Sequence, residues 1–133
     1  GAGAAGGIGY AFMMFLNGML RPGIDIVLDE IGLEEKITQA DLVITGEGRL
    51  DAQTLMGKTP AGVASLAKKY HKRVLAIAGC FGDDVIQCKQ SGLFDDCLAV
   101  KDILSEQEQI HAMEKRNATA HLQKLVKQYF VNW

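Results

Sequence analysis

The sequence predicts an α/β fold in which a parallel sheet lies between two layers of helices, so that the domain has three layers. Three short apolar runs, at 41–45, 73–78 and 97–100, have the composition of buried strands. Segments with helical spacing of apolar residues separate these runs. Continuous apolar strands that alternate with helices are typical of a parallel sheet covered on both faces. The predicted order of elements is α-α-β-α-β-α-β-α.

Residues 1–38 are predicted to form a helical segment. The stretch 4–20 is rich in Ala and Met and apolar on nearly every side, which predicts a buried helix. Arg21-Pro22-Gly23 should end this helix, because proline disfavours helix before it and cannot continue one. Residues 24–38 carry apolar side chains at steps of mostly three and four, which predicts a second helix interrupted at Gly32.

A βαβαβα unit is predicted to follow over residues 41–133. The strand at 41–45 is expected to stop at Gly46. Thr59 is predicted to be the N-cap of the next helix, with Pro60 in its first turn. The strand at 73–78 is expected to stop at Gly79.

The C-terminal part of this unit is predicted to hold two more helices around the third strand. Asp83 is expected to cap a short helix that ends at Gly92. Ser105 and Glu108 fit a capping box, and Ala118, Leu122, Leu125 and Tyr129 follow at helical steps. With right-handed crossovers the sheet is Rossmann-like, and the C-terminal ends of all three strands meet at one edge.

Composition indicates a single domain and argues against two functional classes. A chain of 133 residues can bury roughly two-thirds of its unfolded surface, which is enough for one core. The net charge is −2, whereas proteins held to nucleic acid need clustered basic residues. No apolar run is long enough for a membrane-spanning helix. Cys80, Cys88 and Cys97 form no C-x-x-C pair and are interpreted as structural thiols.

Glycine, acidic and basic residues follow the first predicted strand, at the sheet edge where α/β proteins bind ligands. The candidate site residues are Gly46, Glu47, Gly48, Arg49, Asp51, Thr54 and Lys58. Glycines let the backbone approach a ligand closely. Glu47 and Asp51 are candidate ligands of a shared Mg²⁺, and Arg49 and Lys58 are candidates for neutralising a phosphate. The alternative interpretation is an ordinary loop with solvated charges.

Two familiar nucleotide motifs are incomplete in this chain. Gly57-Lys58-Thr59 resembles the end of a phosphate-binding Walker A loop, but Ala52 stands where that motif requires its first glycine. The G-x-G-x-x-G pattern at 1–6 has no strand before it in this sequence, so a dinucleotide site is not predicted there.

Several motifs occur together in an order and spacing that resemble a known family. They are GAGAAGG at 1–7, LRPG at 20–23, DLVITGEGRLD at 41–51, QT at 53–54, GK at 57–58 and P-x-GVA at 60–64. Together they resemble the C-terminal part of a bacterial glycerate kinase of the class that makes 2-phosphoglycerate. The similarity is dense over residues 1–82 and loose beyond them.

The resemblance implies a cytosolic two-domain α/β enzyme that transfers a phosphoryl group from ATP to glycerate, with Mg²⁺, in a cleft between its domains. In such a reaction Glu47 and Asp51 would hold the metal or orient the attacking hydroxyl, and Arg49 and Lys58 would bind phosphate or carboxylate. Single alanine substitutions at these positions in a complete relative should each lower kcat/KM at least tenfold. Small-molecule substrates, and neither nucleic acid nor membrane, are the expected partners.

Family members are much longer than this chain, so the sequence is interpreted as a fragment. The resemblance implies that an absent N-terminal segment contributes to the active site, and we expect the isolated chain to be inactive. If the helix at 4–20 normally packs on absent parts, its apolar surface should promote self-association. The alternative is a non-catalytic anion- or nucleotide-binding module, or a degenerate remnant of the enzyme.

Overall fold

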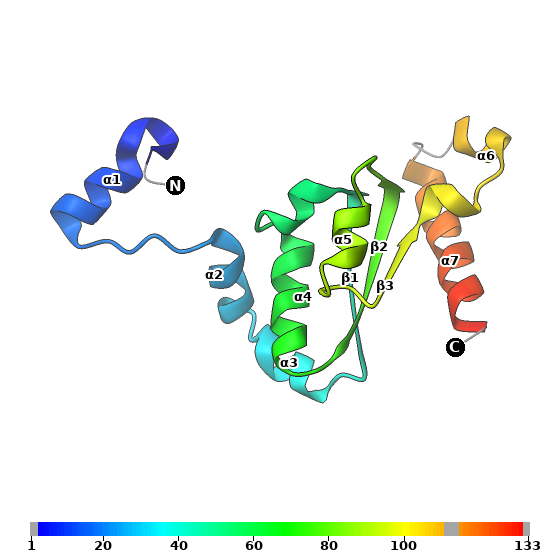
Figure 1. Ribbon diagram of the computed structural model, residues 1–133, viewed down its shortest axis with the longest axis horizontal. Coiled ribbons are helices and arrows are strands. Elements are labelled where there is room, and N and C mark those ends of the chain that lie inside the picture. The colour runs from blue at the N-terminus through cyan, green and yellow to red at the C-terminus, as the bar shows by residue number, and fades with distance from the viewer. Residues whose placement is uncertain (1–2, 111–114, 132–133) are drawn as a thin grey trace.

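The computed structural model describes residues 3–110 and 115–131 and contains a parallel sheet of three strands (Figure 1). The strands are β1 (Leu42–Leu50), β2 (Arg73–Phe81) and β3 (Asp96–Ala99), and they lie side by side in this order. The register pairs Leu42 with Arg73 and Leu50 with Phe81 along the full length of β1 and β2. The predicted α/β class and parallel sheet are therefore confirmed.

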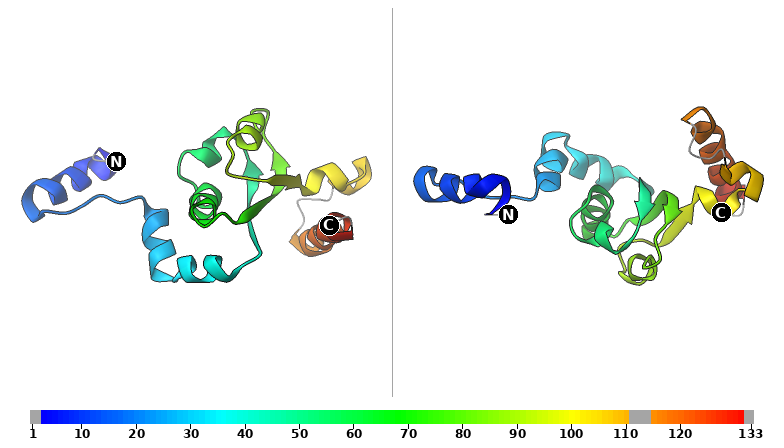
Figure 2. Two further views of the ribbon diagram at one scale, coloured as in Figure 1. Left: turned by 60° about the horizontal axis from the view of Figure 1, so that its bottom comes forward. Right: turned by 90° about the horizontal axis from the view of Figure 1, so that it is seen from above.

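Helices cover both faces of this sheet. Helices α4 (Thr59–Lys69) and α5 (Ile86–Gln90) lie on one face, and α7 (Lys115–Val131) lies on the other, beside β3 (Figure 2). The remaining elements are α2 (Gly23–Glu30), α3 (Leu33–Gln39), η1 (Ala52–Leu55), η2 (Val100–Ile103) and α6 (Glu106–Ile110). The second face is covered only in part, because Ile44 of β1 is 50% exposed.

The core lies between the sheet and α4. Val74, Ala76 and Ala78 of β2 alternate toward it, as one face of a strand requires, and Ala64 and Ala67 of α4 are fully buried against them. These small side chains let the helix and the strand backbones approach closely. The close packing fixes the N-terminus of α4 beside the end of β1.

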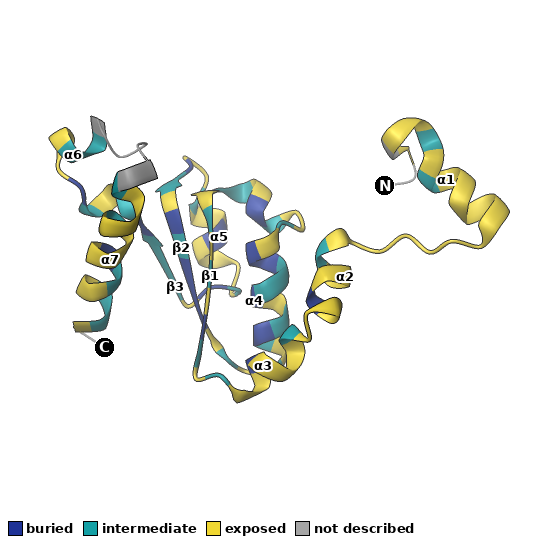
Figure 3. Cartoon of the chain, turned by 180° about the vertical axis from the view of Figure 1, so that it is seen from behind, coloured by how far each residue is buried: buried dark blue, intermediate teal, exposed yellow. Residues whose placement is uncertain are grey.

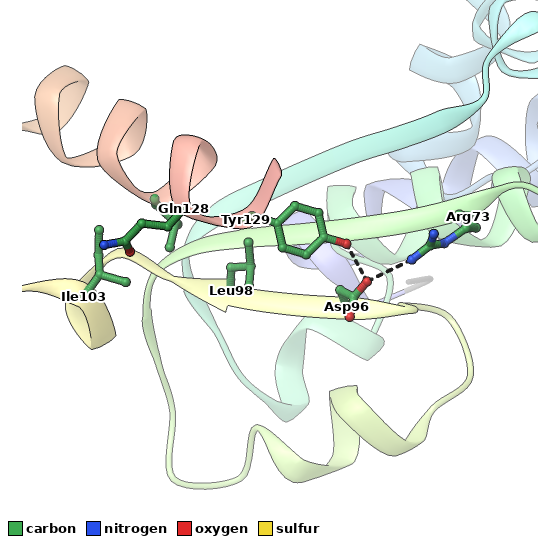
Figure 4. Close-up of a pocket in the computed structure, with 7 residues that line it drawn as sticks. Arg73, Asp96, Leu98, Ile103, Gln128 and Tyr129 are labelled. Carbon is green, nitrogen blue, oxygen red and sulfur yellow. Dashed lines mark hydrogen bonds and ion pairs between the residues drawn. The ribbon is translucent and has the colours of Figure 1, made fainter. Parts of the chain in front are cut away.

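Polar contacts hold α7 to the sheet at the opposite end from the predicted site. The Tyr129 hydroxyl donates to Asp96 Oδ2 at 2.6 Å, and the Arg73 guanidinium lies 3.3 Å from the same oxygen (Figure 4). The neighbouring hollow, of about 470 Å³, is also lined by Leu98 and Leu125. We assign these residues to the packing of α7 on β3.

Helix α1 (Ala4–Leu16) differs from its prediction in length and in burial. It ends at Leu16, four residues earlier than expected, and its C-cap Asn17 adopts the left-handed conformation with φ 52°. The prediction that it is buried is wrong for this chain, because its apolar side chains are exposed (Figure 3). Phe15 is 82% exposed, and Met19 in the following extended segment is 87% exposed. An apolar helix is buried only where another surface covers it, and α1 stands apart from the sheet (Figure 1).

The exposed apolar surface of α1 is expected to drive self-association of the chain. Sedimentation should show a mass that rises with protein concentration, and replacement of Phe15 and Met19 by serine should shift the distribution toward monomer. Replacement of the exposed α7 residues Ala120 and Val131 by serine is the matched control and should leave the distribution unchanged. A strictly monomeric profile at high concentration would contradict the prediction.

Strand β1 is longer than predicted, because it continues through Gly46 to Leu50. The prediction that Gly46 ends the strand is therefore wrong, and Gly46–Arg49 belong to β1 and not to a loop. The physical reason is close approach of the neighbouring strand: a Cβ on Gly46 would lie 2.2 Å from the Ile77 carbonyl oxygen. Glycine at this position permits pairing with β2 and does not interrupt it. β2 likewise runs past Gly79 to Phe81.

Two predicted helix caps are also wrong. The N-cap of α4 is Lys58, and Thr59 is the first helical residue. Asp83 does not cap α5, whose N-cap is Val85 without a side-chain hydrogen bond. Both errors arise because cap propensity alone does not determine which residue leaves the helical conformation. The predicted break at Gly32 is confirmed, since Gly32 separates α2 from α3 in the left-handed conformation.

The predicted capping box at Ser105 is confirmed. Glu108 Oε2 accepts from the Ser105 backbone N–H at 2.8 Å, and the Ser105 hydroxyl accepts from the Glu108 N–H at 3.3 Å. The hydrogen bonds from Ser105 and from Lys124 lower the pKa of Glu108 to about 2. Within the described parts of the chain, no helix combines the length and apolar character needed to cross a membrane. Gly1 of the glycine pattern at 1–6 lies outside the described residues.

Candidate active site at the strand ends

Asp51 occupies the centre of the candidate site, directly after β1. It is the N-cap of η1, where its Oδ1 accepts the Gln53 backbone N–H at 3.0 Å. Arg49 Nε lies 3.6 Å from Oδ2, and Lys58 Nζ lies 3.7 Å from Oδ1. The Asp51 side chain is 17% exposed, whereas the two cations are more open to solvent. The arrangement holds one carboxylate between two basic groups that can turn toward an anion.

Thr54 links the Glu47 carboxylate to the backbone of Asp51. Its hydroxyl donates to Glu47 Oε1 and accepts from the Asp51 backbone N–H at 3.2 Å. Thr54 is 0% exposed, so the hydroxyl is enclosed by protein. Buried polar groups need partners, and here the partners are the two candidate site residues. The hydroxyl that was a candidate for ligand binding is therefore engaged by Glu47 and the Asp51 backbone in this structure.

The loop after β2 completes the support of Asp51, and sequence reasoning missed this contribution. Asp84 Oδ1 accepts the Ala52 N–H at 3.2 Å. A Cβ on Gly82 would lie 2.7 Å from Asp51 Cβ, so glycine allows the two loops to touch. The sequence feature that could have indicated this contact is the pair of acidic residues, Asp83 and Asp84, that follows Gly82 at the end of β2.

A buried thiol also contacts the Asp51 backbone. The Cys88 Sγ donates to the Asp51 carbonyl oxygen at 3.0 Å. Burial, and then the charge of Asp51 and Glu47, raises the pKa of Cys88. The thiol therefore stays protonated and keeps its role as donor. This agrees with the interpretation of Cys88 as a structural thiol.

Glu47 and Lys58 also line a cavity of about 840 Å³ between β1, the start of α4 and helix α2. Gly46, Gly57 and Thr59 contribute to the same cavity. The site residues Glu47, Arg49, Asp51, Thr54 and Lys58 are therefore linked by this cavity and by the contacts around Asp51. Gly48 differs from them, because it lines a separate cavity on the other side of β1.

The site has two carboxylates that could serve Mg²⁺. Among residues 3–110 and 115–131, no group of three or more His, Cys, Asp or Glu side chains is arranged to hold a metal ion. Mg²⁺ in phosphoryl-transfer sites needs only one or two carboxylates, with phosphate oxygens and water completing its shell. Glu47 and Asp51 are the two carboxylates of the candidate site, and they are linked through Thr54, which bonds the Glu47 side chain and the Asp51 backbone.

Comparison with known proteins identifies the family. The description "Glycerate kinase family" applies to a family model that matches residues 1–131. A glycerate 2-kinase of Escherichia coli K12 is 56% identical over 93 residues, which are 70% of this chain and 24% of that protein. A glycerate kinase of Neisseria meningitidis serogroup B is 39% identical over 123 residues, which are 92% of this chain and 32% of the relative.

A solved structure supports the same assignment. The crystal structure assigned as glycerate kinase 2 of Salmonella typhimurium LT2 matches with a TM-score of 0.58 and 41% identity, over 93% of this chain and 33% of that chain. The chain thus spans about a quarter to a third of the length of these relatives. The resemblance found in the sequence motifs is confirmed. The chain belongs to the glycerate kinase family.

Proposed function

We propose that the chain forms one wall of the active site of an ATP-dependent glycerate kinase that produces 2-phosphoglycerate in the cytosol. The observation that carries this proposal is the position of Asp51 between Arg49 and Lys58, at the C-terminal end of a parallel strand. Phosphoryl transfer requires little covalent chemistry from the protein and depends on positioning and charge neutralisation. Family membership supports glycerate and ATP as the two substrates.

Each site residue has a role in this proposal. Asp51 orients the attacking glycerate hydroxyl, and Glu47 and Asp51 would hold Mg²⁺, which supplies positive charge to the phosphates when bound. Arg49 and Lys58 bind phosphate or the glycerate carboxylate. Gly46 adds no side chain to the wall of the cavity that Glu47 and Lys58 line.

The proposal also covers the activity of the chain by itself. The relatives are three to four times longer than the part that this chain matches. We infer that the second wall of the cleft belongs to a part of the enzyme outside that match, and we expect the 133-residue chain alone to have no turnover.

An assay with ATP, Mg²⁺ and glycerate tests this expectation, with the complete E. coli relative as the positive control. Turnover above background by the chain alone would show that it carries a whole site and would contradict the expectation. Calorimetry shows whether an inactive chain binds ATP, and substitutions in the complete relative then separate the two candidate functions. Loss of activity on substitution of the matching site residues in the complete relative supports a kinase wall. Unchanged activity there, with ATP binding by the chain, supports the non-catalytic binding module.

A further inference from the structure

A second cavity, of about 630 Å³, lies across β1 from the site of Asp51. Its floor includes Gly48 of β1 and Gly79 of β2. Its walls include Val100 of η2, Leu104 of the loop that follows η2, and Ala118 of α7. Neither glycine adds a side chain to the floor, and a Cβ on Gly79 would lie 2.7 Å from the Gly48 carbonyl oxygen. The volume and apolar walls are those of sites for small organic molecules.

Gln109 places an oriented acceptor at the lining of this cavity. Its Nε2 donates to the carbonyl oxygens of Lys101 at 3.3 Å and Leu104 at 3.2 Å. Only the amide nitrogen can donate to a carbonyl, so these two contacts fix which way the amide faces. The Gln109 Oε1 has no hydrogen-bond partner among the described residues, and it remains as an acceptor for a ligand N–H group.

His121 of α7 also lines the cavity. Its Nδ1 is buried and has no hydrogen-bond partner in the part of the chain that the structure describes. A buried nitrogen without a partner costs free energy, which a ligand can recover.

We propose that this cavity binds the adenine ring of a nucleotide, an inference that rests on the proposed use of ATP. A flat aromatic ring fits the glycine floor, where no side chain stands in its way. The exocyclic amino group of adenine donates a hydrogen bond, which matches Gln109 Oε1. Hypoxanthine carries an oxygen at that position, so two acceptors would meet and binding would weaken.

The position of the cavity agrees with the site on the other side of the strand. Gly48 lines the cavity and stands between Glu47 and Arg49 in β1. The ribose and phosphates attached to an adenine ring on this floor would extend toward the strand end that carries Arg49. Ligands of open α/β sheets bind at the carboxyl ends of the strands, where this cavity lies.

Protection of Cys80 from alkylation tests the inference on the 133-residue chain. Cys80 is partly buried and lines the cavity, whereas Cys97 lies elsewhere and burial raises its pKa to about 11. We expect saturating adenosine to slow the reaction of Cys80 with iodoacetamide at least fivefold, as followed by mass spectrometry. Inosine at the same concentration should leave the rate within twofold. Equal protection by both nucleosides, or by neither, would overturn the inference.

A matched pair of variants locates the binding. Ala118→Phe fills the cavity from the exposed side of α7, while Ala120→Phe places the same ring two residues away, outside the lining. We expect adenosine to lose its protection of Cys80 in A118F and to keep it in A120F. Retained protection in A118F would place the nucleoside elsewhere and overturn the inference.

Failure of the inference can be told apart from failure of the proposed function. Adenosine has no phosphates, so protection of Cys80 does not depend on phosphoryl transfer. One outcome is that adenosine protects Cys80 while the complete relative keeps full activity after substitution at the position of Asp51. That outcome would contradict only the proposed role of the Asp51 site. An active relative together with an unprotected Cys80 would contradict the adenine cavity alone.

Discussion

Replacement of Asp51 by asparagine is expected to lower kcat/KM by about 100-fold or more, the size of effect seen when one preorganised electrostatic group is lost. The experiment uses a complete relative, such as the E. coli glycerate 2-kinase, with the substitution at the position that matches Asp51. Asparagine preserves the shape of the side chain and can still accept the Gln53 N–H, so the turn into η1 should persist. What changes is the charge that faces Arg49 and Lys58.

The kinetic constants of this variant distinguish two roles for Asp51. If the carboxylate orients the attacking hydroxyl, kcat falls while the KM for ATP changes little. If it serves only to hold Lys58 and Arg49, the KM for ATP rises because both cations lose their anchor. Steady-state kinetics with each substrate varied in turn provides the measurement. We expect the fall in kcat to dominate.

Asp83→Asn is the matched control for this experiment. Asp83 is exposed and lies in the loop after β2. Its substitution by asparagine removes the same charge from the same edge of the sheet as D51N does. Its variant should retain kcat/KM within about twofold, because a solvent-exposed charge is screened. Equal activity of D51N and the wild-type enzyme would remove Asp51 from the site.

Gly46→Ala is expected to cause the largest loss of stability, about 3 kcal/mol in the free energy of unfolding, at the upper end of the usual range for overpacking. The added Cβ would lie 2.2 Å from the Ile77 carbonyl oxygen and 3.3 Å from its carbonyl carbon. These atoms belong to the backbone of β2, which cannot rotate away as a flexible side chain could. The two strands must separate at the middle of their pairing, and the core behind them loosens.

Urea unfolding followed by circular dichroism measures this loss. Gly48→Ala is the control, because it lies two residues further along the same strand and its added Cβ meets no atom within 4 Å. We expect the midpoint of G48A to stay close to that of the parent chain, and the midpoint of G46A to fall clearly. If the two variants unfolded at the same midpoint, the close approach of β1 and β2 at Gly46 would be disproved.

The sheet was predictable because the local amino-acid composition of each strand differs clearly from that of the segments around it. Three apolar runs rich in branched residues were sufficient to identify three buried strands, and the helical spacing between them required parallel connections. The ends of the strands were less predictable. Gly46 was interpreted as a stop, although it permits β1 to pair with β2, since glycine serves both a turn and a close approach. The difference depends on the neighbouring strand, which local sequence does not describe.

The candidate site was likewise predictable in its residues but not in the contacts between them. Glu47 and Asp51 could be selected from the sequence because acidic residues beside glycines follow a buried strand. The links between them could not be selected in this way. Asp84 reaches Ala52 from a segment 32 residues further along the chain, and the Cys88 thiol reaches the Asp51 backbone from 37 residues away. Such contacts depend on where β2 and α5 return to the sheet edge.

The sequence by itself determined the α/β class, the alternation of strands and helices along the chain, the family and the group of charged residues at the sheet edge. Only the tertiary structure decided that β1 extends through the glycines, that the buried Thr54 hydroxyl links Glu47 to the Asp51 backbone, and that α1 is exposed. The physical reason is that periodicity and composition report the local preference of the backbone and the side chains. Burial, hydrogen-bond partners and close approach depend on which distant segments the folded chain brings together.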